Sequence, residues 1–279
     1  MKPEKLIALL EGEAHIAEVL SSTAHTLSLE GVSGSLMPLL AALGARRSGG
    51  VHFFLSEDRD SAAYAYNDIY NILSLFGLSD DRLFLIPSSY KRSLAAGKEE
   101  ASRVAQRTAA LGAISSFLSE GVDTTMPIIL CTYPEALIEK VTSRSQLIEN
   151  TLSVHQGERV DRDFIEQTLR LYEFRKVEFV GEPGEYATRG GIIDLFSFAS
   201  NKPYRIELFG NEIDSIRTFS VSTQLSEQKL DRIEIIPNLG SSIAEQRVSL
   251  IEYIGEGATM WLSGGNNTLS KIDSLGQNC

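Results

Sequence analysis

Hydrophobic positions in the first half of the chain follow a strand–helix alternation. Short apolar runs that suit buried strands lie at residues 26–29, 51–55, 83–86 and 126–131. Apolar residues with helical spacing lie at 3–20, from Pro38 onward, at 59–76, at 96–118 and, briefly, at 134–140. Because strands that alternate with helices pair in parallel, this half predicts a parallel sheet with helices on its faces.

Strands dominate the second half, which predicts a separate α+β unit. A helix is expected at 161–175, with Asp161 near its N-cap. Short strands are expected at 151–154, 192–196, 204–209, 212–219 and 233–236, and residues 177–180 lead into them. Residues 249–254 and 258–262 then indicate a return to mixed structure. The polar, glycine-rich tail at 264–279 is expected to fray.

Three of these strands, 192–196, 204–209 and 212–219, are predicted to form an antiparallel meander. Gly210-Asn211 offers a two-residue connection, since glycine tolerates the positive φ of a tight hairpin. Strand alternation places Arg205, Glu207 and Phe209 on one face, opposite the apolar residues between them. A phenylalanine beside an arginine on the polar face is common at protein interfaces.

Arg189 and Arg205 have two interpretations from spacing alone. Arg189 precedes Gly190-Gly191, which predicts a bulge or bend that would re-aim its side chain. In the first interpretation the arginines pair across strands with Glu207, Glu212 or Asp214, for roughly a few tenths of a kcal/mol each. In the second they belong to an interface with another protein.

The composition is that of an ordinary globular chain and disfavours several functions. A length of 279 residues predicts two compact units. The net charge of −11 and the pI near 5.0 disfavour unaided binding to a phosphate backbone. Cys131 and Cys279 predict no disulfide framework and no metal site, which fits a reducing cytoplasm. No segment has the roughly 18 apolar residues of a membrane span, and no signal-peptide pattern opens the chain.

The segment 27–40 is expected to form a strand, a loop and a helix, where a phosphate-binding loop would lie in such a sheet. A working loop reads G-x-x-x-x-G-K-[ST], whereas this chain reads G-V-S-G-S-L-M-P. The cation, the hydroxyl that holds Mg²⁺ and one amide donor are therefore missing, so we expect no ATP hydrolysis. An accidental glycine turn is the other interpretation. The residues of this degenerate loop are Gly31, Gly34, Leu36, Met37 and Pro38.

No catalytic residue is predicted. The four histidines are dispersed, without a second histidine at the spacing of a metal ligand. Most carboxylates lie on helix faces, where solvated charge is the common role. The sequence shows no nucleophile elbow at Gly31 to Gly34 either.

Four motifs resemble a known module. They read G-E-Y-A-T-R-G-G-I-I-D-L-F (184–196), P-Y-R-I-E-L-F-G-N-E-I-D-S-I-R-T-F (203–219), S-T-Q-L-S (222–226) and I-P-S-S-Y (86–90). Together they resemble the module shared by the excision-repair protein UvrB and the transcription-repair coupling factor Mfd. UvrB keeps an intact phosphate-binding loop and a tyrosine-rich hairpin, whereas loop 87–97 here is short and holds one tyrosine, Tyr90. The chain is therefore similar to the N-terminal, UvrB-like part of Mfd.

The resemblance implies an α/β fold: a degenerate P-loop domain of the RecA/helicase type with a small α+β domain inserted. The first domain is then divided into residues 1–143 and 235–279, and residues 144–234 form the insert, which holds the antiparallel sheet. In this family the insert binds UvrA through two arginines and a phenylalanine, which correspond to Arg189, Arg205 and Phe209. Tyr186 and Glu207 are expected at the rim of that site.

The resemblance also implies a function. The chain is expected to be a non-catalytic recruitment module, without a cofactor, that binds UvrA by mimicking UvrB and so links stalled RNA polymerase to nucleotide excision repair. Domains outside this chain would bind RNA polymerase, translocate on double-stranded DNA with ATP, and mask the UvrA site. The alternative is a UvrB-like, ATP-dependent protein that handles damaged DNA.

Overall fold

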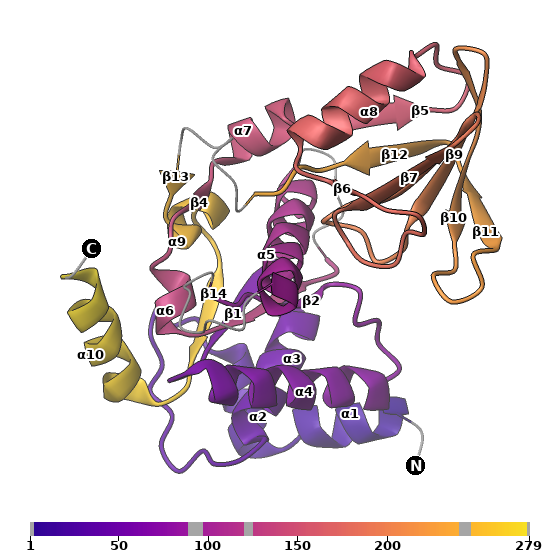
Figure 1. Ribbon diagram of the computed structural model, residues 1–279. Coiled ribbons are helices and arrows are strands. Elements are labelled where there is room, and N and C mark those ends of the chain that lie inside the picture. Colours follow the sequence, from indigo (N-terminus) through magenta and orange to yellow (C-terminus); the bar gives the residue numbers. More distant parts are fainter. Residues whose placement is uncertain (1–2, 89–96, 120–124, 240–246, 278–279) are drawn as a thin grey trace. The chain divides into compact units, whose positions relative to one another are not determined.

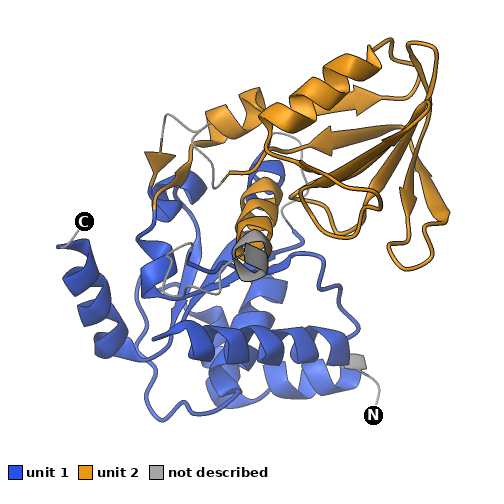
Figure 2. Ribbon diagram, viewed as in Figure 1, with its two compact units in different colours: residues 1–88, 114–139, 249–279 blue, residues 89–113, 140–248 orange. Residues whose placement is uncertain are grey.

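The computed structural model describes residues 3–88, 97–119, 125–239 and 247–277 (Figure 1). The chain divides into two compact units (Figure 2). Unit 1 comprises residues 1–88, 114–139 and 249–279, and unit 2 comprises residues 89–113 and 140–248. Both units are therefore discontinuous in sequence. The division predicted from the resemblance, with bounds at 143 and 234, stays a prediction.

Unit 1 holds a sheet of four strands in the order β14-β1-β3-β2, all parallel. These are β14 (Thr259–Leu262), β1 (Val51–Leu55), β3 (Ile128–Thr132) and β2 (Leu83–Leu85). Every residue of β1 and β3 is buried, as expected for inner strands of a parallel sheet. The expected strands at 51–55, 83–86 and 126–131 are thus confirmed, and the mixed structure expected at 249–262 is the short helix α9 (Leu250–Ile254) followed by β14.

Helices cover this sheet and complete the core of unit 1. The helices of the unit are α1 (Pro3–Glu11), α2 (Ala14–Ser21), α3 (Leu36–Ser48), α4 (Arg59–Leu75), α6 (Pro134–Leu137), α9 (Leu250–Ile254) and α10 (Gly265–Gly276). Ala42 of α3 and Ile69 of α4 pack in one cluster with Phe54 of β1. Asp58 caps α4 by accepting a hydrogen bond from the Ser61 amide at 2.8 Å.

Three expectations for unit 1 are wrong. The helix predicted at 3–20 is two helices, because the chain breaks at Gly12 and the Glu13 carboxylate caps α2. Residues 26–29 form no strand; no neighbouring strand pairs with them, and Leu27 is 48% exposed. The tail is not frayed, because α10 is tied down: Lys271 Nζ lies 3.0 Å from Glu135 Oε1, and Thr268 is buried.

Unit 2 is built on a sheet of six strands in the order β11-β10-β9-β8-β7-β6. These are β6 (Arg175–Lys176), β7 (Glu185–Arg189), β8 (Ile192–Phe196), β9 (Tyr204–Phe209), β10 (Glu212–Phe219) and β11 (Ser226–Leu230). All neighbours are antiparallel except β6 and β7. The predicted meander is confirmed as β8, β9 and β10, and the sheet extends beyond it on both sides.

Two strand pairs and two helices complete unit 2. The pairs are β5 (Leu152–His155) with β12 (Arg232–Ile235) and β4 (Val141–Thr142) with β13 (Arg247–Val248), and the helices are α7 (Arg144–Glu149) and α8 (Arg162–Leu171). Asp161 is the N-cap of α8, which agrees with the sequence. The segment 177–180, expected to lead into the meander, follows the short strand β6, and the Val177 amide still donates to the Tyr186 carbonyl oxygen of β7 at 2.9 Å. Residues 97–113 of α5 (Gly97–Phe117) also belong to this unit.

The core of unit 2 lies on one face of the six-stranded sheet. Ile165 and Leu169 of α8 pack there with Ile206 of β9, and all three are fully buried. Val104 and Ala105 of α5 join the same cluster. Together the two units confirm a mixed α/β fold with one parallel and one antiparallel sheet. Among the described residues, no helix is both long and apolar enough to span a membrane.

Candidate functional site

The opposite face of the six-stranded sheet carries charged side chains and is the candidate site. Cross-strand pairing places Asp194 of β8 beside Arg205 of β9, and Arg205 beside Arg217 of β10. The next row toward the β9–β10 hairpin holds Arg189 and Glu207. We call this surface the charged face. Ile206 points to the core on the other side, as strand alternation predicts.

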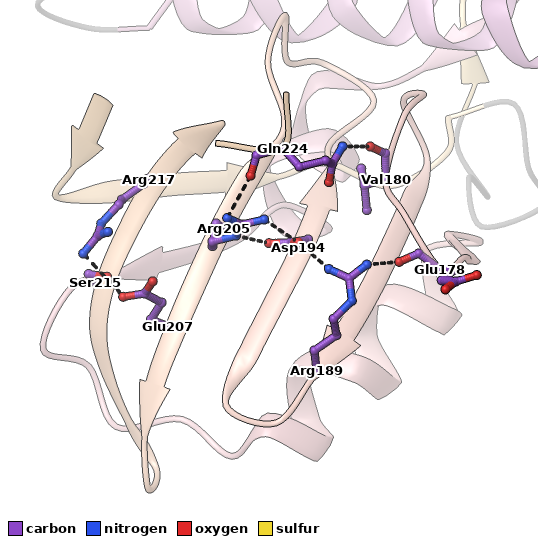
Figure 3. Close-up of polar contacts among 9 residues, drawn as sticks. All are labelled: Glu178, Val180, Arg189, Asp194, Arg205, Glu207, Ser215, Arg217 and Gln224. Atoms are coloured by element: carbon purple, nitrogen blue, oxygen red, sulfur yellow. Dashed lines mark hydrogen bonds and ion pairs between the residues drawn. The ribbon is translucent and has the colours of Figure 1, made fainter. Parts of the chain in front are cut away.

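Asp194 and Arg205 form a bidentate ion pair at the centre of the charged face (Figure 3). Arg205 Nε lies 2.7 Å from Asp194 Oδ1, and Nη2 lies 2.9 Å from Oδ2. Arg205 Nη1 also donates to the Gln224 carbonyl oxygen at 3.2 Å. The bonds to Asp194 raise the pKa of the Arg205 guanidinium above its ordinary value. Arg205 is therefore a cation at any pH at which the protein is folded.

Arg189 approaches the same carboxylate from β7. Its Nη1 lies 3.5 Å from Asp194 Oδ2, and its Nη2 donates to the carbonyl oxygen of Glu178 (Figure 3). The guanidinium stacks over the ring of Phe179, 4.6 Å from the ring centroid. The Arg189 side chain is 43% exposed, against 16% for Arg205. Arg189 is thus the more accessible of the two arginines.

The glycines after Arg189 form a turn. Arg189 pairs with Ile192, so Gly190-Gly191 is the two-residue connection between β7 and β8. Gly190 has a positive φ of 57° and Gly191 approaches the Leu208 carbonyl so closely that a Cβ would lie 2.6 Å from its oxygen. The expected bulge is therefore a hairpin turn, and it places Arg189 at the end of its strand.

Glu207 is engaged within the charged face. Its carboxylate accepts a hydrogen bond from Ser215 Oγ at 2.7 Å, and Arg217 Nη2 lies 3.4 Å from the same oxygen. The Glu207 side chain is about a third exposed. The cross-strand pairing expected of Glu207 is therefore made with Arg217 and not with Arg205.

Phe209 is the most exposed large hydrophobic side chain among the described residues, with 84% of its surface in contact with solvent. It ends β9, and Gly210-Asn211 connects it to Glu212, its partner across the hairpin. Gly210 has the positive φ of 63° that the sequence predicted. A hollow of about 340 Å³ next to Phe209 is lined by Arg159, Val160, Asp161, Asn211 and Glu212. Single exposed hydrophobic side chains are common on protein surfaces, so its exposure alone assigns Phe209 no role.

Tyr186 does not belong to the charged face. It pairs with Leu195, so strand alternation turns it toward the core, where only 1% of its surface is exposed. Its hydroxyl accepts a hydrogen bond from Arg170 Nε at 3.2 Å. The rim position expected for Tyr186 is corrected: its role in unit 2 is packing.

Asp194 was not among the residues predicted for the site, although the interpretation from spacing was open to other carboxylates. That interpretation considered Glu207, Glu212 and Asp214 as partners of the arginines, whereas among the described residues the ion pairs of Arg189 and Arg205 are both with Asp194. A usable signal was present, because Asp194 lies in the otherwise apolar strand I-I-D-L-F. A carboxylate inside a buried strand has to find a positive partner.

The degenerate loop lies in unit 1, at the N-terminal end of α3. Ser35 is the N-cap residue but makes no side-chain cap bond, Met37 packs against the core, and Pro38 is buried. Gly31 and Gly34 have positive φ angles of 73° and 57°. Because 26–29 form no strand, the strand–loop–helix arrangement of a phosphate-binding loop is incomplete. Tyr90 and most of the loop at 87–97 lie outside the described residues.

Among the described residues, no cluster of three or more histidine, cysteine, aspartate or glutamate side chains could hold a metal ion. The one buried cysteine among them, Cys131, lies in β3, and burial raises the pKa of its thiol. The chemistry of the charged face is instead that of ion pairing and apolar contact.

Comparison with known proteins agrees with the resemblance seen in the sequence. Residues 152–239, which include the charged face, match the model of the UvrB interaction domain. The transcription-repair-coupling factor of Escherichia coli (strain K12) is 37% identical over 109 residues, which is 39% of this chain and 10% of the relative. That of Haemophilus influenzae is 39% identical over 101 residues, and that of Bacillus subtilis (strain 168) is 32% identical over 133 residues.

The alignments thus cover about a tenth of the length of these relatives and at most about half of this chain. They confirm that the chain is similar to transcription-repair-coupling factors and that it contains a segment of the UvrB interaction type.

Proposed function

We propose that this chain is a non-catalytic recruitment module that binds the excision-repair protein UvrA through the charged face. One observation carries the proposal: Phe209, 84% exposed, lies on the same face as Arg189 and the Asp194–Arg205 pair, inside the matched segment. Aromatic side chains and arginines are the residue types that are enriched in interface hot spots.

In this proposal each side chain has a defined part. Phe209 would fill an apolar pocket of UvrA, and Arg189 would pair with a carboxylate of UvrA. Arg205, which is less exposed, would offer the remaining N–H groups of its guanidinium to a second carboxylate. Glu207 would lie at the rim, already bonded to Ser215.

The proposal extends to the larger protein of which such a module is part. There the module would bring UvrA to a stalled RNA polymerase in the cytoplasm and so couple transcription to nucleotide excision repair. Further domains would bind the polymerase, translocate on double-stranded DNA with ATP, and cover the charged face until it is needed. Unit 1 would be a degenerate P-loop domain that needs no cofactor for the recruitment of UvrA.

Phe209→Ala tests the proposal, because a side chain that is 84% exposed can be removed without disturbing the core. We expect the affinity for UvrA, measured by calorimetry with the whole chain, to fall by about 2 kcal/mol or more, which is roughly thirtyfold. Phe164→Ala is the matched control, since Phe164 is also an exposed phenylalanine, at 51%, but lies on α8.

Equal affinity of Phe209→Ala and the unaltered chain would contradict the proposal, as would an equal loss in Phe164→Ala. Arg205→Ala is a weaker test, because it removes the bidentate partner of the buried Asp194 carboxylate and thereby destabilises unit 2. Its affinity is informative only if its melting temperature is measured as well.

A further inference from the structure

We propose that Asp194 is the positioning residue of the charged face: its carboxylate holds the guanidinium groups of Arg189 and Arg205 in the geometry in which they meet UvrA. The inference rests on the proposed function and deepens it. It adds to the docking surface a residue that does not itself touch the partner.

The position of Asp194 between the arginines is the first support. It lies on the middle one of three strands, with Arg189 on one neighbouring strand and Arg205 on the other. Only 2% of its side chain is exposed, so it is closed to a partner protein. Its Oδ2 lies 2.9 Å from Arg205 Nη2 and 3.5 Å from Arg189 Nη1 (Figure 3). One buried oxygen thus approaches both guanidinium groups.

The balance of charge is the second support. Two guanidinium groups this close would repel each other without a negative charge between them. Asp194 supplies one negative charge for two positive ones, so one unit of positive charge is left over on a chain with a net charge of −11. The excess positive charge would attract an acidic surface of the partner, and the buried carboxylate holds the two guanidinium groups side by side.

The remaining contacts of each arginine are the third support. Arg205 stacks over Phe219 at 4.8 Å and donates to the Gln224 carbonyl, and Arg189 stacks over Phe179 at 4.6 Å and donates to the Glu178 carbonyl. Each guanidinium is therefore fixed by an aromatic ring, a backbone oxygen and Asp194. Arginine side chains ordered before docking lose less freedom when they bind.

A purely structural role for Asp194 is the competing explanation, and a double-mutant cycle separates the two. The affinity of UvrA for the whole chain is measured for Asp194→Asn, Arg189→Ala and the double variant. The matched cycle replaces Arg189→Ala with Phe209→Ala. Asparagine keeps the shape of the side chain and removes its charge. Melting temperatures are recorded for all variants.

If Asp194 positions the arginines, Arg189→Ala weakens binding about tenfold in the unaltered chain and less than about threefold next to Asp194→Asn. Phe209→Ala weakens binding by the same factor in both backgrounds, because its side chain does not depend on the carboxylate. An Arg189→Ala effect of the same size in both backgrounds would overturn the inference.

A second measurement needs neither a folded Asp194→Asn variant nor UvrA. In nuclear magnetic resonance spectra of the unaltered chain, the guanidinium N–H groups of Arg189 and Arg205 should give resolved, slowly exchanging signals. Those of Arg59, an exposed arginine of α4, should be averaged. Averaged signals from Arg189 and Arg205 would overturn the inference. If the unaltered chain fails to bind UvrA, the proposed function falls, while slowly exchanging signals would still support two arginines held in place beside Asp194.

Discussion

The buried side chain of His52, in β1, bonds to Trp261 of β14 through Nδ1 and to the end of α3 through Nε2. Nδ1 lies 3.0 Å from Trp261 Nε1, which can only donate, so Nδ1 is the unprotonated acceptor. Nε2 then carries the hydrogen and lies 2.9 Å from the Gly49 carbonyl oxygen. Neutral imidazole satisfies every partner, whereas imidazolium would place a second N–H against the indole N–H.

The stability of the chain should therefore depend on pH through His52. Burial lowers the pKa of His52 below its ordinary 6.5, so the unfolded chain binds the proton more readily. The stabilisation is fully present above pH 6.5 and is lost as the pH falls through the lower, folded-state pKa. The free energy of unfolding, measured in urea between pH 7.5 and 5.5, gives the size of this loss. His52→Gln should remove this part of the pH dependence, and His25→Gln, an exposed control, should keep it.

Gly44 is required by a close approach within unit 1. A Cβ at this position would lie 2.5 Å from Trp261 Cζ2. In an open helix Gly→Ala stabilises, but Gly44→Ala should lower the free energy of unfolding by about 1–3 kcal/mol because the indole ring has to move. Chemical denaturation checks the value. Gly276→Ala, where a Cβ would meet nothing within 4 Å, is the matched control. A stabilised Gly44→Ala variant would refute this packing argument.

At the scale of elements, the strands and turns that were predicted correctly are those that local sequence patterns determine. Strands β1, β3 and β8 to β10 are apolar or alternating runs between turn residues, and each was predicted within about two residues. The hairpin at Gly210-Asn211 followed from turn chemistry. In the candidate site, the shared face of Arg205, Glu207 and Phe209 followed from alternation alone.

The remaining elements depend on distant partners. The apolar run at 26–29 is strand-like, but a strand needs a neighbour and no described strand pairs with it. Helix α10 is polar and weakly helical by composition, and it is held by Lys271 against Glu135, far away in sequence. In the site, the pairing of both arginines with Asp194 depends on the register of three strands. Spacing along one strand does not contain that information.

Helix α8 offers a test of local stabilisation. Its N-cap residue, Asp161, accepts a hydrogen bond from the Asp163 amide at 3.0 Å. Asp161→Ala should lower the free energy of unfolding by about 1 kcal/mol, since one amide loses its partner. Asp161→Ser, which restores a cap, should recover most of it. Denaturant melts give both values, and equal stability of the alanine and serine variants would show that the cap contributes nothing.

At the scale of the whole molecule, nucleotide binding separates the proposed recruitment module from an ATP-dependent relative. The first turn of α3 carries Leu36, Met37 and Pro38, which supply neither a cation nor a hydroxyl for phosphate and Mg²⁺. We expect no saturable heat when Mg-ATP is titrated into the chain. A clear binding isotherm that is lost on removing Mg²⁺ would favour the alternative of a UvrB-like, ATP-dependent protein.

The parallel pairing of β1 with β14 sets an order of events during synthesis. The strand at residues 51–55 pairs with residues 259–262, so the sheet of unit 1 has an open edge along β1 until residues 259–262 have left the ribosome. The strands of unit 2 all lie between 141 and 248 and can pair earlier. The residues of unit 1 that are made first therefore complete their sheet last, and the six-stranded sheet of unit 2 can form while β1 still has an unpaired edge.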